Sequence, residues 1–166
     1  MRIVIDLQGA QTESRYRGIG RYTMSLTKAI VRNRGNHEII IALSGLFPET
    51  IEKIRAEFDE LLPQENIRVW HAPGPTTESG PGNDWRRQVA ELIREAFLAS
   101  LKPDIVHVMS LFEGFEDDGI TSIGRFDTST PVSATLFDLI PLVNRDHYLK
   151  PNTGYDEYYQ RKIAYL

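Results

Sequence analysis

Cysteine is absent from this chain of 166 residues, which excludes disulfide bonds and thiolate chemistry. An excess of positive charge is also missing: the net charge of −4 gives none of the basic surface that nucleic-acid binding usually requires. The N-terminus lacks a charged lead followed by an apolar run, and the longest apolar runs, such as 39–43, are far shorter than a membrane span. Together these absences predict a cytoplasmic protein that does not bind nucleic acid.

Short apolar runs alternate with helical patterns along the whole chain. The runs occupy 2–6, 38–43, 66–71, 105–109 and 131–136; the helical patterns occupy 20–32, 48–62, 84–101 and the residues from 154 onward. Such alternation is typical of a parallel sheet with helices on both faces. We therefore predict an α/β fold, a single Rossmann-like domain over 1–166. Between these elements we expect a short helix near 119–123 and irregular structure over 138–150.

Apolar residues at three-four spacing predict which side of each helix faces the sheet. In the first helix this stripe consists of Tyr22, Leu26, Ala29 and Ile30. In the helix over 84–101 it consists of Trp85, Val89, Leu92, Ile93, Ala96 and Phe97. We expect both stripes to pack against the core, and for the second stripe a membrane surface is the alternative.

A loop with two glycines precedes the first long helix and reads Arg17-Gly18-Ile19-Gly20-Arg21-Tyr22. A helix N-terminus carries unpaired N–H groups and a partial positive charge, and glycine lets a ligand approach closely. The loop therefore predicts a site for a phosphate or a carboxylate. The segment 8–17 before it is longer than the usual connection of about two to six residues, and we expect it to be mobile.

Other nucleotide sites fit this loop less well. In a dinucleotide fingerprint the third glycine would fall at Thr23, and here the glycines lie far from the end of the first strand. A nicotinamide-dependent oxidoreductase therefore remains the weaker enzyme hypothesis. A P-loop is excluded because the chain has no Gly-Lys-Ser or Gly-Lys-Thr. The histidines form no close pair, so we predict neither a metal nor another cofactor.

In a parallel α/β sheet, ligands bind beyond the carboxyl ends of the strands. There, His107 is either a ligand contact or a hydrogen-bonded core histidine. Glu113 and Gly114 follow the same strand and either bind a substrate or form a turn. Asp138 follows the last strand, where a carboxylate either acts on a hydroxyl group or caps the next turn.

Five stretches, taken in order, carry a resemblance to a known family. They are Met1 to Asp6, Arg17-Gly18-Ile19-Gly20-Arg21-Tyr22, Pro103-Asp104-Ile105-Val106-His107, Ser110-Leu111-Phe112-Glu113-Gly114 and Phe137-Asp138-Leu139-Ile140-Pro141-Leu142. The ordered set resembles the N-terminal half of glycosyltransferase family four. The resemblance implies the two-domain GT-B architecture. In that architecture an N-terminal Rossmann-like domain binds the acceptor, and a C-terminal domain holds the nucleotide-sugar.

The resemblance implies a retaining transferase that needs no metal and moves a sugar from a nucleotide-sugar to a glycan or lipid-linked acceptor, often in bacterial polysaccharide synthesis. By position, Asp138 would be the catalytic residue near the reacting sugars. Phe137 stands where many relatives have a histidine before that aspartate. The residues expected beside the donor phosphates are Gly18, Ile19, Gly20 and Arg21; those expected at the acceptor are Gln8, His107, Glu113 and Gly114.

The family's donor domain, with its paired glutamates, is absent from these 166 residues. We therefore expect a truncated chain or one half of a split protein, with no activity alone and an incomplete anion site. Peripheral contact with the inner face of a membrane is a further expectation. The rival from another class is a non-catalytic Rossmann-like module that binds a phosphorylated metabolite.

Overall fold

The computed structural model describes residues 1–137 and 139–166. Its centre is a parallel sheet of five strands in the order β3-β2-β1-β4-β5. The strands are β1 (Arg2–Asp6), β2 (Glu38–Ser44), β3 (Ile67–Trp70), β4 (Ile105–Val108) and β5 (Val132–Ala134). In this doubly wound order the direction of winding reverses between β1 and β4, where ligands bind in open α/β sheets. The predicted Rossmann-like α/β class is confirmed.

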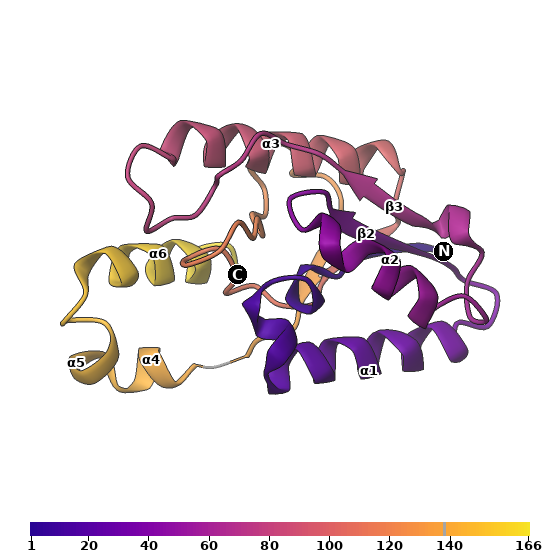
Figure 1. Ribbon diagram of the computed structural model, residues 1–166, viewed down its shortest axis with the longest axis horizontal. Coiled ribbons are helices and arrows are strands. Elements are labelled where there is room, and N and C mark those ends of the chain that lie inside the picture. Colours follow the sequence, from indigo (N-terminus) through magenta and orange to yellow (C-terminus); the bar gives the residue numbers. More distant parts are fainter. Residues whose placement is uncertain (138) are drawn as a thin grey trace.

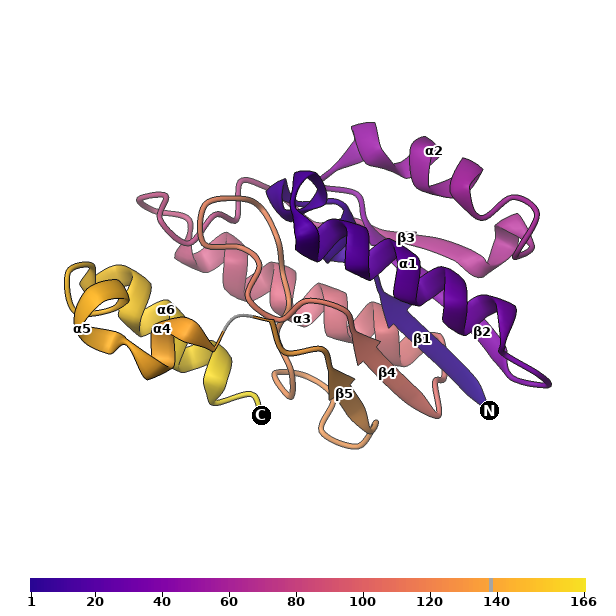
Figure 2. The same cartoon turned by 90° about the horizontal axis from the view of Figure 1, so that it is seen from below.

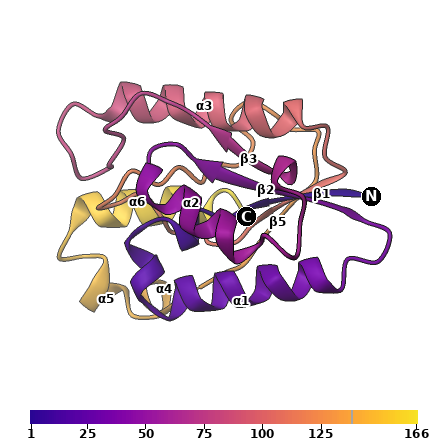
Figure 3. The same ribbon diagram turned by 45° about the vertical axis from the view of Figure 1, so that its right-hand side comes forward.

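Helices cover both faces of the sheet, as Figures 1 and 3 show. On one face lie α1 (Gly18–Arg32) and α2 (Pro48–Glu57), and on the other lies α3 (Asp84–Ser100). Neighbouring residues of a strand point to opposite faces, so each strand contributes to two cores. Ile5 packs in a cluster with Val31 of α1 and Phe58, while Val4 packs with Leu98 of α3.

A group of three helices lies beyond the carboxyl ends of the strands (Figure 2). They are α4 (Ile140–Val143), α5 (Arg145–Tyr148) and α6 (Thr153–Ile163), so the prediction of irregular structure over 138–150 is wrong. The side chain of Asn152 accepts a hydrogen bond of 3.0 Å from the Tyr155 N–H and thereby caps α6. Tyr158 and Tyr159 of α6 are buried in a cluster with Phe112 and Phe115.

Residues 8–12 of the segment from 8 to 17 are buried, which does not fit the expectation of a mobile loop, whereas Glu13, Tyr16 and Arg17 are exposed. It forms two 3₁₀ turns, η1 (Gln8–Ala10) and η2 (Glu13–Tyr16). The Gln11 amide is buried and bonds to both backbone groups of Ser44 at the end of β2, at 2.7 and 3.0 Å, and to the hydroxyl of Thr50 at 2.9 Å. Such a buried amide holds a loop in place because leaving it unbonded costs free energy.

Each predicted helix stripe is correct in part, because Leu26 and Ile30 of α1 and Ile93 and Phe97 of α3 pack against the core. The buried residues of α1 are Gly20, Thr23, Thr27 and Val31, whereas Tyr22 is 51% exposed. In α3 the buried residues include Glu91, Arg94 and Glu95; Trp85, Val89 and Leu92 are 58%, 38% and 43% exposed. The helical period therefore placed part of each stripe correctly, and in α3 the buried side also includes charged residues that have polar partners.

Smaller differences concern the bounds of elements. The first helix begins at Gly18, two residues before its predicted start, and α2 ends at Glu57 rather than near 62. The expected short helix near 119–123 does not form. Among the described residues, no helix combines the length and the apolar character needed to cross a membrane.

Candidate functional site

The Glu113 carboxylate lies beyond the end of β4, beside the point where the winding of the sheet reverses. It is 3% exposed and accepts hydrogen bonds from three hydroxyl groups: Ser110 at 2.6 Å, Thr12 at 2.7 Å and Ser14 at 3.0 Å. Ser110 follows β4, whereas Thr12 and Ser14 belong to the loop that follows β1. The carboxylate therefore joins the two segments that flank the reversal point.

Burial raises the pKa of Glu113, the three hydroxyl donors lower it, and nearby Asp117 raises it further. Burial likewise raises the pKa of Asp117, against hydrogen bonds from the backbone N–H groups of Gly119, Glu13 and Gly114. Because their pKa values are raised, both carboxyl groups bind a proton more readily than exposed carboxyl groups do. Such a pair can accept hydrogen bonds from the hydroxyl groups of a ligand.

These carboxyl groups face a cleft of about 520 Å³. It is lined by Glu13, Ser14, Arg17, Phe112 to Asp117, Asn152 and Tyr155. The lining therefore comes from the loop after β1, the loop after β4 and the start of α6. It contains four carboxyl groups and one guanidinium, and this excess of negative charge suits a neutral, hydroxyl-rich ligand better than a phosphate.

Gln8, expected at the acceptor, belongs to a buried network behind the cleft. Its amide donates to Asp6 and to the Ile120 carbonyl, and its oxygen accepts from the Ile120 N–H at 2.9 Å. Arg94 of α3 donates to the same Asp6 carboxylate, at 2.7 Å from its Nε, and to the Ser122 carbonyl at 2.8 Å. These contacts favour a structural role for Gln8, and acceptor binding by this residue stays a prediction.

His107 lies within β4, and its ring bridges to the neighbouring strand. Its Nδ1 is 2.8 Å from the Ser133 hydroxyl and its Nε2 is 3.0 Å from the Thr135 hydroxyl. Burial lowers the pKa of His107. Engagement of both ring nitrogens favours the hydrogen-bonded core histidine, while its proposed contact with the acceptor remains untested.

Gly114 follows Glu113 and allows the chain to turn there. Its φ is +100°, and a Cβ at this position would lie 2.0 Å from the Gly119 carbonyl oxygen. A residue with a side chain would meet both an unfavourable backbone conformation and a clash. Gly114 therefore shapes the wall of the cleft, whether or not it also contacts a ligand.

The residues of the predicted anion site separate in the structure. Gly18, Ile19 and Gly20 form the first turn of α1, and Arg17 before them provides no side-chain cap. The uncapped N–H groups suit an anion. Arg21 instead lines a groove of about 410 Å³ between α1 and α2 together with Gly20, Arg15, Lys28 and Lys53. Arg17, rather than Arg21, lines the Glu113 cleft.

The two glycines at the start of α1 differ in what they permit. A Cβ on Gly20 would lie 2.4 Å from the Arg15 Cα and 2.6 Å from the Ser14 oxygen, while a Cβ on Gly18 would meet nothing within 4 Å. Gly20 is thus required for the close packing of η2 on α1. Gly18 leaves open space for a ligand.

We predict opposite outcomes for alanine at these two positions. Gly20→Ala is expected to lower the free energy of unfolding by about 1–3 kcal/mol, because the η2 backbone must move. Gly18→Ala is expected to stay within about 1 kcal/mol of the wild type. Urea denaturation checks both values. Equal stability of the two variants would show that η2 can shift without cost.

The catalytic residue expected from the sequence, Asp138, lies outside the described residues. Its neighbour Phe137 packs edge-on against Tyr22 of α1, with ring centroids 5.4 Å apart. Phe137 therefore lies beside the first turns of α1, where the donor phosphates are expected. Its catalytic role stays a prediction.

Sequence reasoning did not assign several residues to this site. The cleft residues Ser14, Asp117, Asn152 and Tyr155 were missed, and so were Thr12 and Ser110 as hydroxyl donors to Glu113. Ser110 and Asp117 flank Glu113 after a predicted strand, which was a usable signal. Asn152 and Tyr155 gave no such signal in the sequence, because their positions at the cleft depend on how α6 packs. Among the described residues, no group of three or more His, Cys, Asp or Glu side chains could hold a metal ion.

Curated proteins related to this chain give the site a context. A protein of Escherichia coli described as serotype-specific mannosyltransferase WbdA is 37% identical over 166 residues, which is 99% of this chain. Two others with the same description and organism are 33% identical over 141 residues, or 84% of this chain. The chain is homologous to glycosyltransferases. The resemblance in its ordered motifs is thereby confirmed.

The homology covers only part of each glycosyltransferase relative. This chain spans 20% of the length of the first and 17% of the length of the other two. No protein-family model matches the chain, and no solved structure matches it. The relationship to glycosyltransferases therefore rests on these sequences. The alignment with the first relative covers nearly the whole of this chain, and so it includes both walls of the Glu113 cleft.

Proposed function

We propose that this chain is the acceptor-binding domain of a GT-B glycosyltransferase that, in the complete protein, transfers mannose from a nucleotide-sugar to a glycan or lipid-linked acceptor. The description of the relatives as mannosyltransferases supports the reaction and the sugar. The observation that carries the assignment of the acceptor is the Glu113 cleft, whose carboxyl groups can accept hydrogen bonds from sugar hydroxyls. Phe112 and Phe115 add apolar surface for the faces of the sugar rings.

On the donor side, we propose that the uncapped first turn of α1 contributes to a diphosphate site. Gly18, Ile19 and Gly20 would supply backbone N–H groups, and Arg21 would supply charge from the adjoining groove. In this proposal a second domain holds the rest of the nucleotide-sugar, Asp138 acts near the reacting carbon, and transfer proceeds with retention and without a metal.

Charge argues against a phosphorylated metabolite in the Glu113 cleft. The cleft has four carboxyl groups against Arg17 alone, so a phosphate there would face net repulsion. The spacing of the glycines gives the nicotinamide hypothesis no added support. Polysaccharide synthesis at the inner face of a membrane is the setting that we propose.

Titration of the chain with mannose oligosaccharides tests the proposal. We expect weak but saturable binding by calorimetry, which Glu113→Gln should reduce by about tenfold because one charged acceptor is lost. The nucleotide-mannose donor and a nicotinamide dinucleotide should bind far more weakly.

The matched control is Glu60→Gln. Glu60 is exposed and lies three residues after the end of α2. It should leave oligosaccharide binding unchanged. Stronger binding of the dinucleotide or of a sugar phosphate than of the oligosaccharides would contradict the proposal.

A further inference from the structure

Helix α6 supplies one wall of the Glu113 cleft. Asn152, its N-cap, and Tyr155 in its first turn both line the cleft. The Tyr155 ring meets the ring of Phe115 edge-on, with centroids 4.9 Å apart. The shape of the cleft therefore depends on where α6 lies against the loop that carries Glu113.

A direct hydrogen bond joins α6 to Glu113 itself. The Tyr158 hydroxyl donates to the backbone carbonyl oxygen of Glu113 at 3.0 Å, and the Tyr158 side chain is 1% exposed. Its ring packs against Phe115, with centroids 5.2 Å apart. A buried tyrosine hydroxyl of this kind has one orientation available and holds its acceptor in place.

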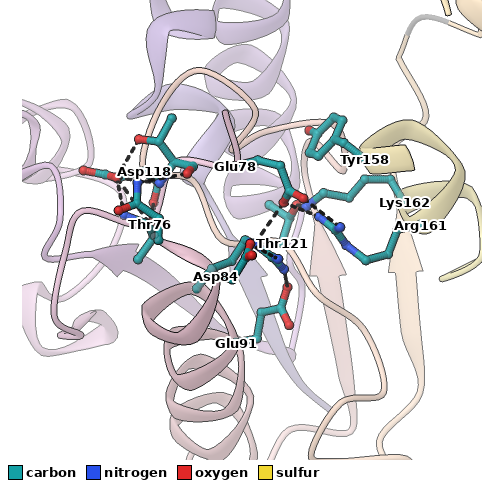
Figure 4. A network of polar contacts seen from close by, with 12 residues as sticks. Thr76, Glu78, Asp84, Glu91, Asp118, Thr121, Tyr158, Arg161 and Lys162 are labelled. Atoms are coloured by element: carbon teal, nitrogen blue, oxygen red, sulfur yellow. Dashed lines mark hydrogen bonds and ion pairs between the residues drawn. The ribbon is translucent and has the colours of Figure 1, made fainter. Parts of the chain in front are cut away.

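The end of α6 is held by a network of charged groups, shown in Figure 4. Arg161 makes two hydrogen bonds to the Glu78 carboxylate, one of them 2.8 Å long. The same carboxylate lies 2.9 Å from the Nε of Arg87 on α3. Arg87 also pairs with Asp84 and Glu91, at 3.0 and 3.4 Å. Glu78 thus links the end of α6 to α3.

The next residue of α6 ties it to the segments on both sides of Glu113. Lys162 is 4% exposed, and its ammonium donates a hydrogen bond of 2.5 Å to the Thr121 hydroxyl (Figure 4). That hydroxyl donates to the Leu111 carbonyl at 2.6 Å. Leu111 lies two residues before Glu113, so a second chain of hydrogen bonds runs from α6 to the carboxylate segment.

We propose that Tyr158 and Arg161 are positioning residues for acceptor binding, which act by fixing Glu113 and Tyr155 relative to each other across the cleft. The inference rests on the proposed function of the cleft. Neither residue lines the cleft, so their effect on a ligand is transmitted through the residues that do. Loss of either anchor would let α6 shift, and small displacements of binding groups have large effects on recognition.

The test combines two variants with oligosaccharide titration. Tyr158→Phe removes only the hydroxyl group. Arg161→Gln removes the positive charge, while Glu78 keeps its ion pair with Arg87. Each is expected to weaken binding of a mannose oligosaccharide by about tenfold. Arg161→Lys keeps a charge that can reach Glu78 and should restore most of the affinity. Circular dichroism at the titration temperature confirms that each variant remains folded.

The matched controls are Tyr148→Phe and Arg68→Gln. Tyr148 is 44% exposed on α5, and Arg68 is exposed on β3, away from α6. Neither control should change binding. Unchanged affinity in both Tyr158→Phe and Arg161→Gln, with intact controls, would overturn the inference while leaving the acceptor site itself standing.

Amide hydrogen exchange without any ligand separates this inference from the proposed function. In Tyr158→Phe and Arg161→Gln, exchange should rise at residues 112–117 and 152–155 and stay constant in α1 and α2. If the wild type binds no oligosaccharide, the proposed function fails and exchange still decides whether α6 positions the Glu113 segment. Unchanged exchange at 112–117 contradicts the inference.

Discussion

Replacing Arg94 with methionine is expected to lower the free energy of unfolding by about 3–5 kcal/mol. Arg94 and Asp6 are each 1% exposed, and the guanidinium donates to the carboxylate from two of its nitrogens. Methionine matches the length of the apolar stem but leaves the Asp6 charge buried, with Gln8 as its one remaining donor among the described residues. The loss also frees the Ser122 carbonyl, which Arg94 now satisfies at 2.8 Å. Urea denaturation measures the change.

A partly exposed ion pair gives the control for this prediction. Arg125 has a side chain 48% exposed and lies 3.3 Å from the buried Glu91, which keeps its pair with Arg87 at 3.4 Å, so Arg125→Met should cost less than about 1 kcal/mol. Adding Asp6→Asn to Arg94→Met should recover part of the loss, because no buried charge is then left alone. A single Arg94→Met variant as stable as the wild type would mean that water reaches Asp6.

Replacing Lys162 with methionine is expected to change how stability depends on pH. Burial lowers the pKa of Lys162 to about 7 from an ordinary value of 10.5; Glu91 opposes this shift, and Arg161 and Arg94 add to it. Below pH 7 the ammonium is charged in both the folded and the unfolded chain, so folding bears the whole cost of burying it. As pH rises, the folded chain loses the proton before the unfolded chain does, and the cost falls.

The wild type should therefore gain stability relative to Lys162→Met by on the order of 3 kcal/mol between pH 7 and pH 10. Measuring the free energy of unfolding of both proteins across this range isolates the lysine from other titrating groups. Thr121 keeps its bond to Leu111 in the variant, so no new buried donor is left unpaired. Lys150→Met, with a side chain 69% exposed, serves as the control and should show no such slope. A constant difference between wild type and Lys162→Met would show that Lys162 titrates normally.

Much of the fold could be predicted from local patterns. The β-branched runs at 2–6 and 38–43 became neighbouring central strands, because only a strand buried on both faces is apolar at every position. A helix begins at the two glycines as expected, although its first residue is Gly18 rather than Gly20. The alternation of strands and helices was sufficient for the parallel sheet, since parallel neighbours need a crossover between them.

The inward side of α3 could be predicted only in part. Of its apolar stripe, Ile93 and Phe97 pack against the core, whereas Trp85, Val89 and Leu92 are exposed, and Arg94 and Glu95 are buried. Arg94 is buried because Asp6, 88 residues away, points to that face, and Glu95 because it accepts 2.6 Å hydrogen bonds from the Ser122 hydroxyl and the Phe126 N–H. Periodicity shows which side of a helix is apolar, but it holds no information about distant polar partners.

The candidate site, like the helices, could be predicted only where it depends on residues that are close along the chain. The position of Glu113 after a strand was visible in the sequence, and so was the helix start at Gly18, because each depends on residues that are close along the chain. The three hydroxyl donors to Glu113 come from two loops, and Asn152 and Tyr155 come from a helix near the other end of the chain. By itself the sequence determined the class of fold, the sheet edge that carries the site and the kinship with glycosyltransferases. Only the tertiary structure decided which residues share the cleft, because side chains far apart in sequence meet only when the helices and loops are packed.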